Sequence, residues 1–192
     1  MYELLFLPCG YLLGSIPFAY LVVRARKVDI FQVGTGNPGA VNVFREVSRR
    51  AGVAVLLGDA AKGVVPVVLA RLVGVSPWLA LAAGVCALAG HWYPVFLRFR
   101  GGAGLATVIG VAFAMMPLPA LLGSLPGALV LYVRHDAGLT AGVGFLGLFV
   151  AALLLGGPVA LALAVAALPA LALARQRLLP TPGVRREVGE EA

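Results

Sequence analysis

Charge is scarce in this sequence. Only 12% of the 192 residues are Asp, Glu, Lys or Arg, about half the share that a soluble domain carries. Residues 4–23, 101–133 and 137–174 contain no charged residue at all. Apolar runs of about 18 or more residues are long enough to cross a bilayer as helices. The missing charge therefore excludes a sizeable soluble domain and predicts an integral membrane protein.

Residues that hold metals or redox groups are also few. The two cysteines, Cys9 and Cys86, lie inside apolar segments and show neither zinc-site nor redox-pair spacing. No cluster of acidic residues accompanies the two histidines, His91 and His135. We therefore expect no metal site and no cofactor.

Two other patterns are missing. No stretch alternates with period two, which argues against a transmembrane β-barrel. The first residues include Glu3 and no basic cluster, unlike a cleaved signal peptide. We expect the first apolar run to be retained as a helix.

Proline and glycine divide the apolar sequence into helices. Because proline ends or kinks helices, the run 101–133 should split at residues 115–119 and the run 137–174 at residues 156–158. The short halves next to Pro119 should be tilted or span the membrane incompletely. Three further helices are expected at residues 4–23, 51–73 and 76–97.

The predicted fold class is all-α, a polytopic membrane bundle of about seven transmembrane helices. It forms one integral-membrane domain, residues 1–174, followed by a polar cytoplasmic tail, residues 175–192. Seven spans place 13 of the 15 Lys and Arg on one side of the membrane. Basic residues favour the cytoplasmic side, so we expect the N-terminus outside and the C-terminus inside. These residues are Arg24, Arg26, Lys27, Arg45, Arg49, Arg50, Arg98, Arg100, Arg134, Arg175, Arg177, Arg185 and Arg186.

The net charge of +7 follows from this asymmetry. A basic face beside anionic lipid headgroups accounts for the charge. We expect no nucleic-acid partner, because the basic residues are divided among short loops.

The stretch "GTGNPGAVNVFR", residues 34–45, forms the first loop on the basic side. Glycine lets a ligand approach the backbone, and successive N–H groups in such a turn bind anions. Arginine suits phosphate. The loop could equally be a flexible turn with an interfacial arginine. The groups predicted to bind phosphate or to act in catalysis here are Gly34, Thr35, Gly36, Asn37, Gly39, Asn42 and Arg45.

A second loop repeats this composition at "GHWYPVFLRFRGGAGLAT", residues 90–107. Arg100, Gly101 and Gly102 precede a predicted helix, whose N-terminus favours anions. A single loop of this kind is most simply interpreted as a tight interfacial turn. Two such loops on one face of the protein favour an anion-binding site. His91 could act as an acid or base; a polar residue bonded near the interface is the favoured reading.

Asp59 and Lys62 interrupt the second predicted helix and, three residues apart, share one of its faces. Ionisable groups within a membrane are costly and are usually paired or functional. A structural pair is slightly favoured over a pair that holds the two loops or contacts the substrate.

Four motifs in this order resemble the bacterial membrane acyl-phosphate:glycerol-3-phosphate acyltransferases, the PlsY type. They are "GSIPFAYLV" (14–22), "GTGNPGAVNVFR" (34–45), "DAAKG" (59–63) and "GHWYPVFLRFRGGAG" (90–104).

The resemblance implies seven helices, an outside N-terminus and an active site on the cytoplasmic face of the cell inner membrane. It implies transfer of a fatty acyl group from acyl phosphate to the 1-hydroxyl of glycerol 3-phosphate, which gives lysophosphatidic acid in phospholipid synthesis. Acyl phosphate, glycerol 3-phosphate and membrane lipids would be the partners.

Carried over by position, the resemblance assigns catalytic roles to Thr35, Asn42 and Arg45. It assigns supporting roles to Asp59, Lys62 and His91. Thr35 replaces a family serine and keeps the hydroxyl, whereas Val41 replaces a threonine and loses a donor.

Three positions depart from the family pattern. Ala103 stands where the family has a phosphate-binding lysine. "GLTA" (138–141) replaces a Ser-Leu-Ala-Ser segment, and "ARQRLLP" (174–180) lacks the family's His and Asn. A diverged paralogue with another acceptor, or without activity, therefore stays open. A small transporter is a weaker alternative, because no inverted repeat is visible and the polar motifs lie at one face.

Overall fold

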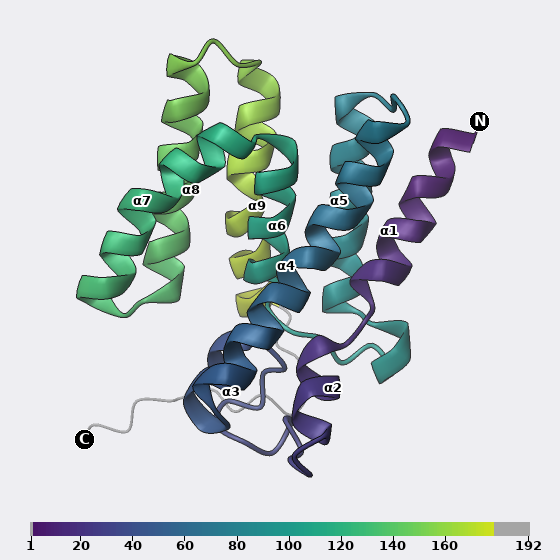
Figure 1. Ribbon diagram of the computed structural model, residues 1–192, viewed down its shortest axis with the longest axis vertical. Coiled ribbons are helices and arrows are strands. Elements are labelled where there is room, and N and C mark those ends of the chain that lie inside the picture. Colours follow the sequence, from purple (N-terminus) through teal and green to yellow (C-terminus); the bar gives the residue numbers. More distant parts are fainter. Residues whose placement is uncertain (1, 179–192) are drawn as a thin grey trace.

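The computed structural model describes residues 2–178, and every regular element in that part of the chain is helical (Figure 1). The all-α class is therefore confirmed. The elements are η1 (Tyr2–Leu5), α1 (Phe6–Gly14), α2 (Phe18–Arg24), α3 (Ala40–Glu46), α4 (Arg49–Leu72), α5 (Pro77–Trp92), η2 (Val95–Leu97), α6 (Leu105–Met115), α7 (Pro117–Arg134), α8 (Ala137–Leu154) and α9 (Val159–Leu178).

Six helical segments of the described chain are long and apolar enough to cross a membrane. The other apolar segment, α6, has only 11 residues and rises about 16 Å, roughly half the hydrocarbon thickness. The multi-span architecture is thus confirmed, whereas six spans rather than seven meet the length requirement. The helix is short because Gly104 precedes its first residue and the proline-rich break follows its last.

Local chemistry sets several helix boundaries. The Ser48 hydroxyl accepts a hydrogen bond from the backbone N–H of Ala51 at the start of α4. Ser76 caps α5 in the same way, with Pro77 in its first turn. The predicted breaks at residues 115–119 and 156–158 are confirmed, since α7 begins at Pro117 and α9 at Val159. These caps satisfy N–H groups that a helix cannot satisfy itself.

Two expected boundaries are wrong. Residues 40–46 form the short helix α3 rather than loop, because Val43 packs into an apolar cluster and holds this turn against α4. The expected tail begins too early, since α9 continues through Arg175 to Leu178. The remainder of the tail, including Arg185 and Arg186, lies outside the described residues.

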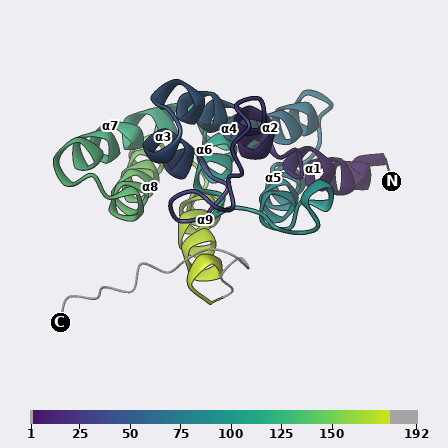
Figure 2. The ribbon, with the colours of Figure 1, turned by 90° about the horizontal axis from the view of Figure 1, so that it is seen from below.

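Small residues let the helices pack closely, as membrane helices require. A side chain at Gly14 of α1 would collide with the backbone of Ala87 in α5, and one at Gly110 of α6 with Ala60 in α4. Seen from the end, α4 and α6 lie centrally, with α1 and α5 on one side and α7 and α8 on the other (Figure 2).

Arg71 stabilises the end of the short helix α6. Its guanidinium Nη1 donates to the carbonyl of Ala114 at 2.7 Å and to that of Met115 at 3.2 Å. Pro119 has no N–H to offer the Met115 carbonyl. Arg71 therefore satisfies backbone oxygens that the break between α6 and α7 leaves without a helical partner.

Candidate active site

The first loop has an internal brace. The buried Asn42 side chain accepts a hydrogen bond from the backbone N–H of Thr35 at 3.1 Å and donates to the carbonyl of Val33 at 3.0 Å. Gly34 has a φ of 54° and Gly36 a φ of 69°. Both values lie in the left-handed region that favours glycine. Asn42, predicted as catalytic, thus uses both ends of its amide to shape the loop.

The other predicted groups of this loop lie around its outer turn. The half-buried Thr35 accepts a hydrogen bond from the N–H of Asn37 at 3.4 Å, and the Gly39 N–H donates to the Asn37 carbonyl. Arg45 is exposed in the last turn of α3. Ile30 and Val43, both fully buried, anchor the two ends of the loop in a small apolar cluster with α2 and α4.

The second loop turns sharply between α5 and α6. Arg98 and Phe99 both adopt left-handed φ, at 50° and 63°, a rare conformation for residues with a side chain. The indole N–H of Trp92 donates to the carbonyl of Ala103 at 2.9 Å. Gly104, with φ of 91°, precedes the first residue of α6, so the predicted glycine turn into a helix is confirmed.

The two loops meet at Gly102. A Cβ atom at Gly102 would lie 2.8 Å from His91 Nε2, 2.9 Å from the Pro38 carbonyl oxygen and 3.2 Å from Asn37 Oδ1. The Arg100 guanidinium carbon lies 4.2 Å from the centre of the Phe31 ring, within the range of a cation–π contact. Two stretches recognised separately in the sequence therefore form one structure.

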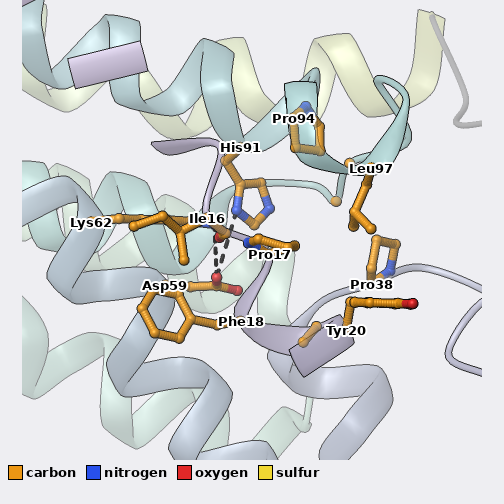
Figure 3. A pocket seen from close by; sticks show the side chains of 13 residues that line it. Ile16, Pro17, Phe18, Tyr20, Pro38, Asp59, Lys62, His91, Pro94 and Leu97 are labelled. Carbon is orange, nitrogen blue, oxygen red and sulfur yellow. Dashed lines mark hydrogen bonds and ion pairs between the residues drawn. The ribbon is translucent and has the colours of Figure 1, made fainter. Parts of the chain in front are cut away.

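A buried ionic group lies beneath this junction (Figure 3). Lys62 Nζ lies 2.9 Å from Asp59 Oδ1 and donates to the carbonyl of Ile16 at 3.0 Å. His91 Nδ1 lies 3.8 Å from the same carboxylate oxygen. The exposed fractions of Asp59, Lys62 and His91 are 2%, 5% and 5%. Lys62 thereby connects α4 to the break between α1 and α2, where the Ile16 carbonyl also accepts a hydrogen bond from the Phe18 N–H at 3.1 Å.

A small pocket opens between these elements. From the predicted set, the residues that line it are Asp59, Lys62, His91, Gly101 and Gly102. Those that do not line it are Gly34, Thr35, Gly36, Asn37, Gly39, Asn42, Arg45 and Arg100. The structure therefore brings the supporting residues and the second loop together, while Arg45 lies apart from the pocket wall.

Sequence reasoning missed several groups at this site. Phe18 and Tyr20 of α2 line the pocket, whereas the sequence pattern at residues 14–22 predicts no role for either side chain. Arg175 of α9 donates to the Trp92 carbonyl at 3.4 Å, and its guanidinium carbon lies 4.9 Å from the centre of the Tyr93 ring. The sequence carried no signal for this contact, which joins residues 83 positions apart.

The fold and site define a class: an integral membrane protein with two glycine-rich basic loops joined above a buried ion pair. The family model for glycerol-3-phosphate acyltransferase matches residues 4–178. The chain belongs to this family.

Similar proteins agree with the family. The glycerol-3-phosphate acyltransferase of Rubrobacter xylanophilus is 49% identical over 117 residues, 61% of this chain and 59% of that protein. The enzyme of that name from Geobacter sulfurreducens is 47% identical over 132 residues, 68% of this chain and 65% of its own length. The chain thus spans about three fifths of these curated relatives.

Two solved structures share the fold. Both are crystal structures of PlsY (YgiH), described as an integral membrane glycerol 3-phosphate acyltransferase. The glycerol 3-phosphate form has a TM-score of 0.82 and 33% identity, covering 92% of this chain and 89% of that chain. The lysophosphatidic acid form has a TM-score of 0.79 and 34% identity over the same shares.

Proposed function

We propose that this protein transfers a fatty acyl group from acyl phosphate to the 1-hydroxyl of glycerol 3-phosphate, giving lysophosphatidic acid for phospholipid synthesis. The observation that carries the proposal is the junction of two glycine-rich basic loops at Gly102 in a chain of this family. Arginine side chains and glycine-exposed backbone N–H groups are suited to phosphate. Both substrates carry one.

The chemistry asks little of the protein, because acyl phosphate is an activated mixed anhydride. The acceptor hydroxyl oxygen forms a bond to the acyl carbon, and the bond from that carbon to the phosphate oxygen breaks. The phosphate leaves with the electron pair, and the hydroxyl proton passes to a phosphate oxygen. The protein has to orient both substrates and stabilise negative charge. We assign this task to Arg45, Thr35 and Arg100, and the reaction needs no cofactor.

The proposal can be tested by an acyl-transfer assay in detergent or lipid. The donor is a long-chain acyl phosphate, and the acceptors are a panel of hydroxyl compounds. Transfer to glycerol 3-phosphate is the expected result. Transfer only to another acceptor would favour the diverged-paralogue alternative, for which Ala103 and the altered segment at 174–180 are the specific observations.

We also propose that the joined loops face the cytoplasm, with the N-terminus outside the cell membrane. The 13 basic residues on one predicted side support this orientation. So does the ribbon, in which the N-terminus lies at the opposite end of the bundle from α2 and α3 (Figure 1).

Labelling of single cysteines should test this orientation. We expect cysteines introduced in residues 34–45 and 98–104 to escape a membrane-impermeant thiol reagent in intact cells and to react after permeabilisation. A Cys9→Ala, Cys86→Ala background removes the native thiols. A cysteine between α4 and α5, at Gly74, is the control that should react in intact cells. Labelling of either loop in intact cells would contradict the proposal.

Restoring the missing lysine should strengthen acceptor binding. A hydrogen bond to a charged group contributes roughly 1.5–3 kcal/mol, and each 1.4 kcal/mol is about tenfold. We expect Ala103→Lys to lower the apparent KM for glycerol 3-phosphate by about one to two orders of magnitude and to leave that for acyl phosphate nearly unchanged. Initial rates at varied acceptor measure this.

An unchanged acceptor KM would show that another cation, such as Arg100 above Phe31, already binds the acceptor phosphate. Ala106→Lys, on the first turn of α6, is the matched control for added charge. An equal gain in this control would mean that the effect is non-specific attraction.

A further inference from the structure

The turn that follows α5, residues 94–99, carries large apolar side chains on its outer surface. Val95, Phe96 and Phe99 are 43%, 61% and 57% exposed, and Arg98 between them is also exposed. Single exposed apolar side chains are common, but a group of them within a few residues marks an interaction surface. The 94–99 turn therefore presents a surface that is suited to an apolar environment rather than to water.

The backbone fixes this surface. The N–H groups of Leu97 and Phe99 donate to the Pro94 carbonyl at 3.1 and 2.9 Å. Arg98 and Phe99 keep their left-handed φ within this hydrogen-bonded turn, a costly conformation that persists only where the surrounding structure holds it. Pro94 and Leu97 also line the pocket. The turn therefore has an inner surface on the pocket and an outer surface formed by the exposed side chains.

Contacts with two other helices place the turn at the edge of the hydrocarbon layer. Arg175 in α9 is the first charged residue after the charge-free run 137–174, and such residues at the ends of spanning helices reach the interface. Its guanidinium carbon lies 4.9 Å from the centre of the Tyr93 ring. The hydroxyl of Tyr11 in α1 donates to the carbonyl of Tyr93 at 2.8 Å. Tyr93 directly precedes the turn, so the turn begins where α9 leaves the apolar layer.

The first span indicates the same depth. Residues 16–20 line the pocket together with Pro94 and Leu97. Arg24, the first basic residue of this span, follows Tyr20 by four residues, about 6 Å of helix. In Figure 1 and Figure 2 the turn, teal in colour, lies at the edge of the bundle. Its outer surface therefore meets the bilayer on the apolar side of the first basic residue.

The composition of the turn fits the interface of a bilayer. Aromatic side chains concentrate at that level. The stem of an arginine can lie along apolar groups while its guanidinium reaches the lipid phosphates. On the proposed cytoplasmic side, anionic lipids complement the charge of Arg98. A soluble protein would have to displace lipid to reach side chains at this depth, so lipid is the occupant that the depth favours.

We infer that the outer surface of the 94–99 turn is a lipid-binding surface. Val95, Phe96 and Phe99 insert among the acyl chains of the adjacent leaflet, and Arg98 binds the phosphate of an anionic lipid.

This surface has a consequence for the acyl donor. Because Pro94 and Leu97 on the inner surface line the pocket, a turn fixed in the leaflet holds the pocket beside the acyl chains. A long-chain acyl phosphate has the two parts of a lipid, an apolar chain and a phosphate, and reaches the pocket along the leaflet. This consequence rests on the proposed acyl transfer, whereas the lipid contact does not.

Spin labelling tests the lipid contact in the full chain, reconstituted in vesicles of equal parts phosphatidylethanolamine and phosphatidylglycerol. A nitroxide is attached at Phe96→Cys in the Cys9→Ala, Cys86→Ala background. We expect this label to be more accessible to oxygen, which partitions into hydrocarbon, than to a water-soluble nickel complex. A label at Gln32→Cys, exposed in the first loop, is the control that should show the opposite order. A label at position 96 that behaves like the control would overturn the lipid contact.

A thermal-shift titration in detergent tests the role of Arg98. Phosphatidylglycerol should raise the unfolding midpoint of the parent more than phosphatidylcholine does, and inorganic phosphate should leave it unchanged. In Arg98→Asn, which keeps a residue that tolerates left-handed φ, the difference between the two lipids should shrink. A difference as large as in the parent, or an equal shift with inorganic phosphate, would overturn the binding of lipid phosphate by Arg98.

Donor length tests the consequence for acyl transfer. In the double variant Phe96→Ser, Phe99→Asn we expect kcat/KM for palmitoyl phosphate in vesicles to fall by about tenfold, because apolar contact with the leaflet is lost. The value for butyryl phosphate, a water-soluble donor, should stay close to that of the parent. Leu154→Ser removes an exposed apolar side chain at the last residue of α8 and should change neither value.

The possible failures are distinguishable. Equal losses for both donors in the double variant would mean that the turn only shapes the pocket, which would overturn its role in donor delivery. A parent that transfers neither acyl group would overturn the proposed function, while the spin labels would still decide whether the turn contacts lipid.

Discussion

Replacing Lys62 by methionine should remove most of the folded protein. The Asp59 carboxylate would remain 2% exposed without its ion-pair partner, and the Ile16 carbonyl would lose one of its two donors and keep the Phe18 N–H. Breaking a buried pair from one side costs roughly 3–5 kcal/mol, a large part of a typical stability of about 5–15 kcal/mol. The measurements are the yield of monodisperse protein in mild detergent and the midpoint of its thermal unfolding.

The matched control is Lys27→Met, which changes the other lysine of the sequence at an exposed position with φ of 58°. It should leave yield and midpoint close to those of the parent. The double variant Asp59→Asn, Lys62→Met removes the stranded charge and should regain part of the lost stability. A single Lys62→Met variant as stable as the parent would show that Asp59 is not held by this pair.

Replacing Arg45 by alanine should weaken acyl phosphate binding by about a hundredfold or more. Two charge-assisted hydrogen bonds to one phosphate would be lost, each worth roughly 1.5–3 kcal/mol. Arg45→Lys should recover only part of the affinity, because a point charge cannot make the bidentate contact. Apparent KM for acyl phosphate at saturating acceptor, together with a thermal-shift titration of acyl phosphate, measures the effect.

Arg49→Ala provides the control, since Arg49 is exposed in the first turn of α4 close to Arg45 in sequence. Its effect should stay within the modest loss that a surface charge produces. If the Arg45→Ala variant binds acyl phosphate as tightly as the parent protein does, the donor phosphate does not bind at Arg45. The pocket wall, which Arg45 does not line, would then be the first region to examine.

Helix boundaries and loop composition were predictable because their causes are local. Ser76 and Pro77 begin α5, and the prolines after Met115 end α6, through their own backbone chemistry. The common position of the two glycine-rich loops followed from the number of membrane crossings between them. Their contact at Gly102 agrees with that prediction.

What the sequence could not predict depends on contacts between distant segments. Helix α3 exists because Val43 finds apolar partners in α2 and α4, and a seven-residue segment has little helical tendency alone. The hydrogen bond from Arg175 to the Trp92 carbonyl depends on where the end of the last helix lies relative to α5. The brace formed by Asn42 required a structure, since the same amide could have faced a ligand.

The bond from Lys62 to the Ile16 carbonyl has a consequence for biosynthesis. The donor is made 46 residues after its acceptor, which at about 5–20 residues per second corresponds to roughly two to nine seconds of translation. During that interval the Ile16 carbonyl has the Phe18 N–H as a partner but not yet the ammonium group of Lys62. The first segment should therefore stay at the insertion machinery or at the bilayer surface until α4 emerges. Assembly of the bundle would then begin with the pairing of these two segments.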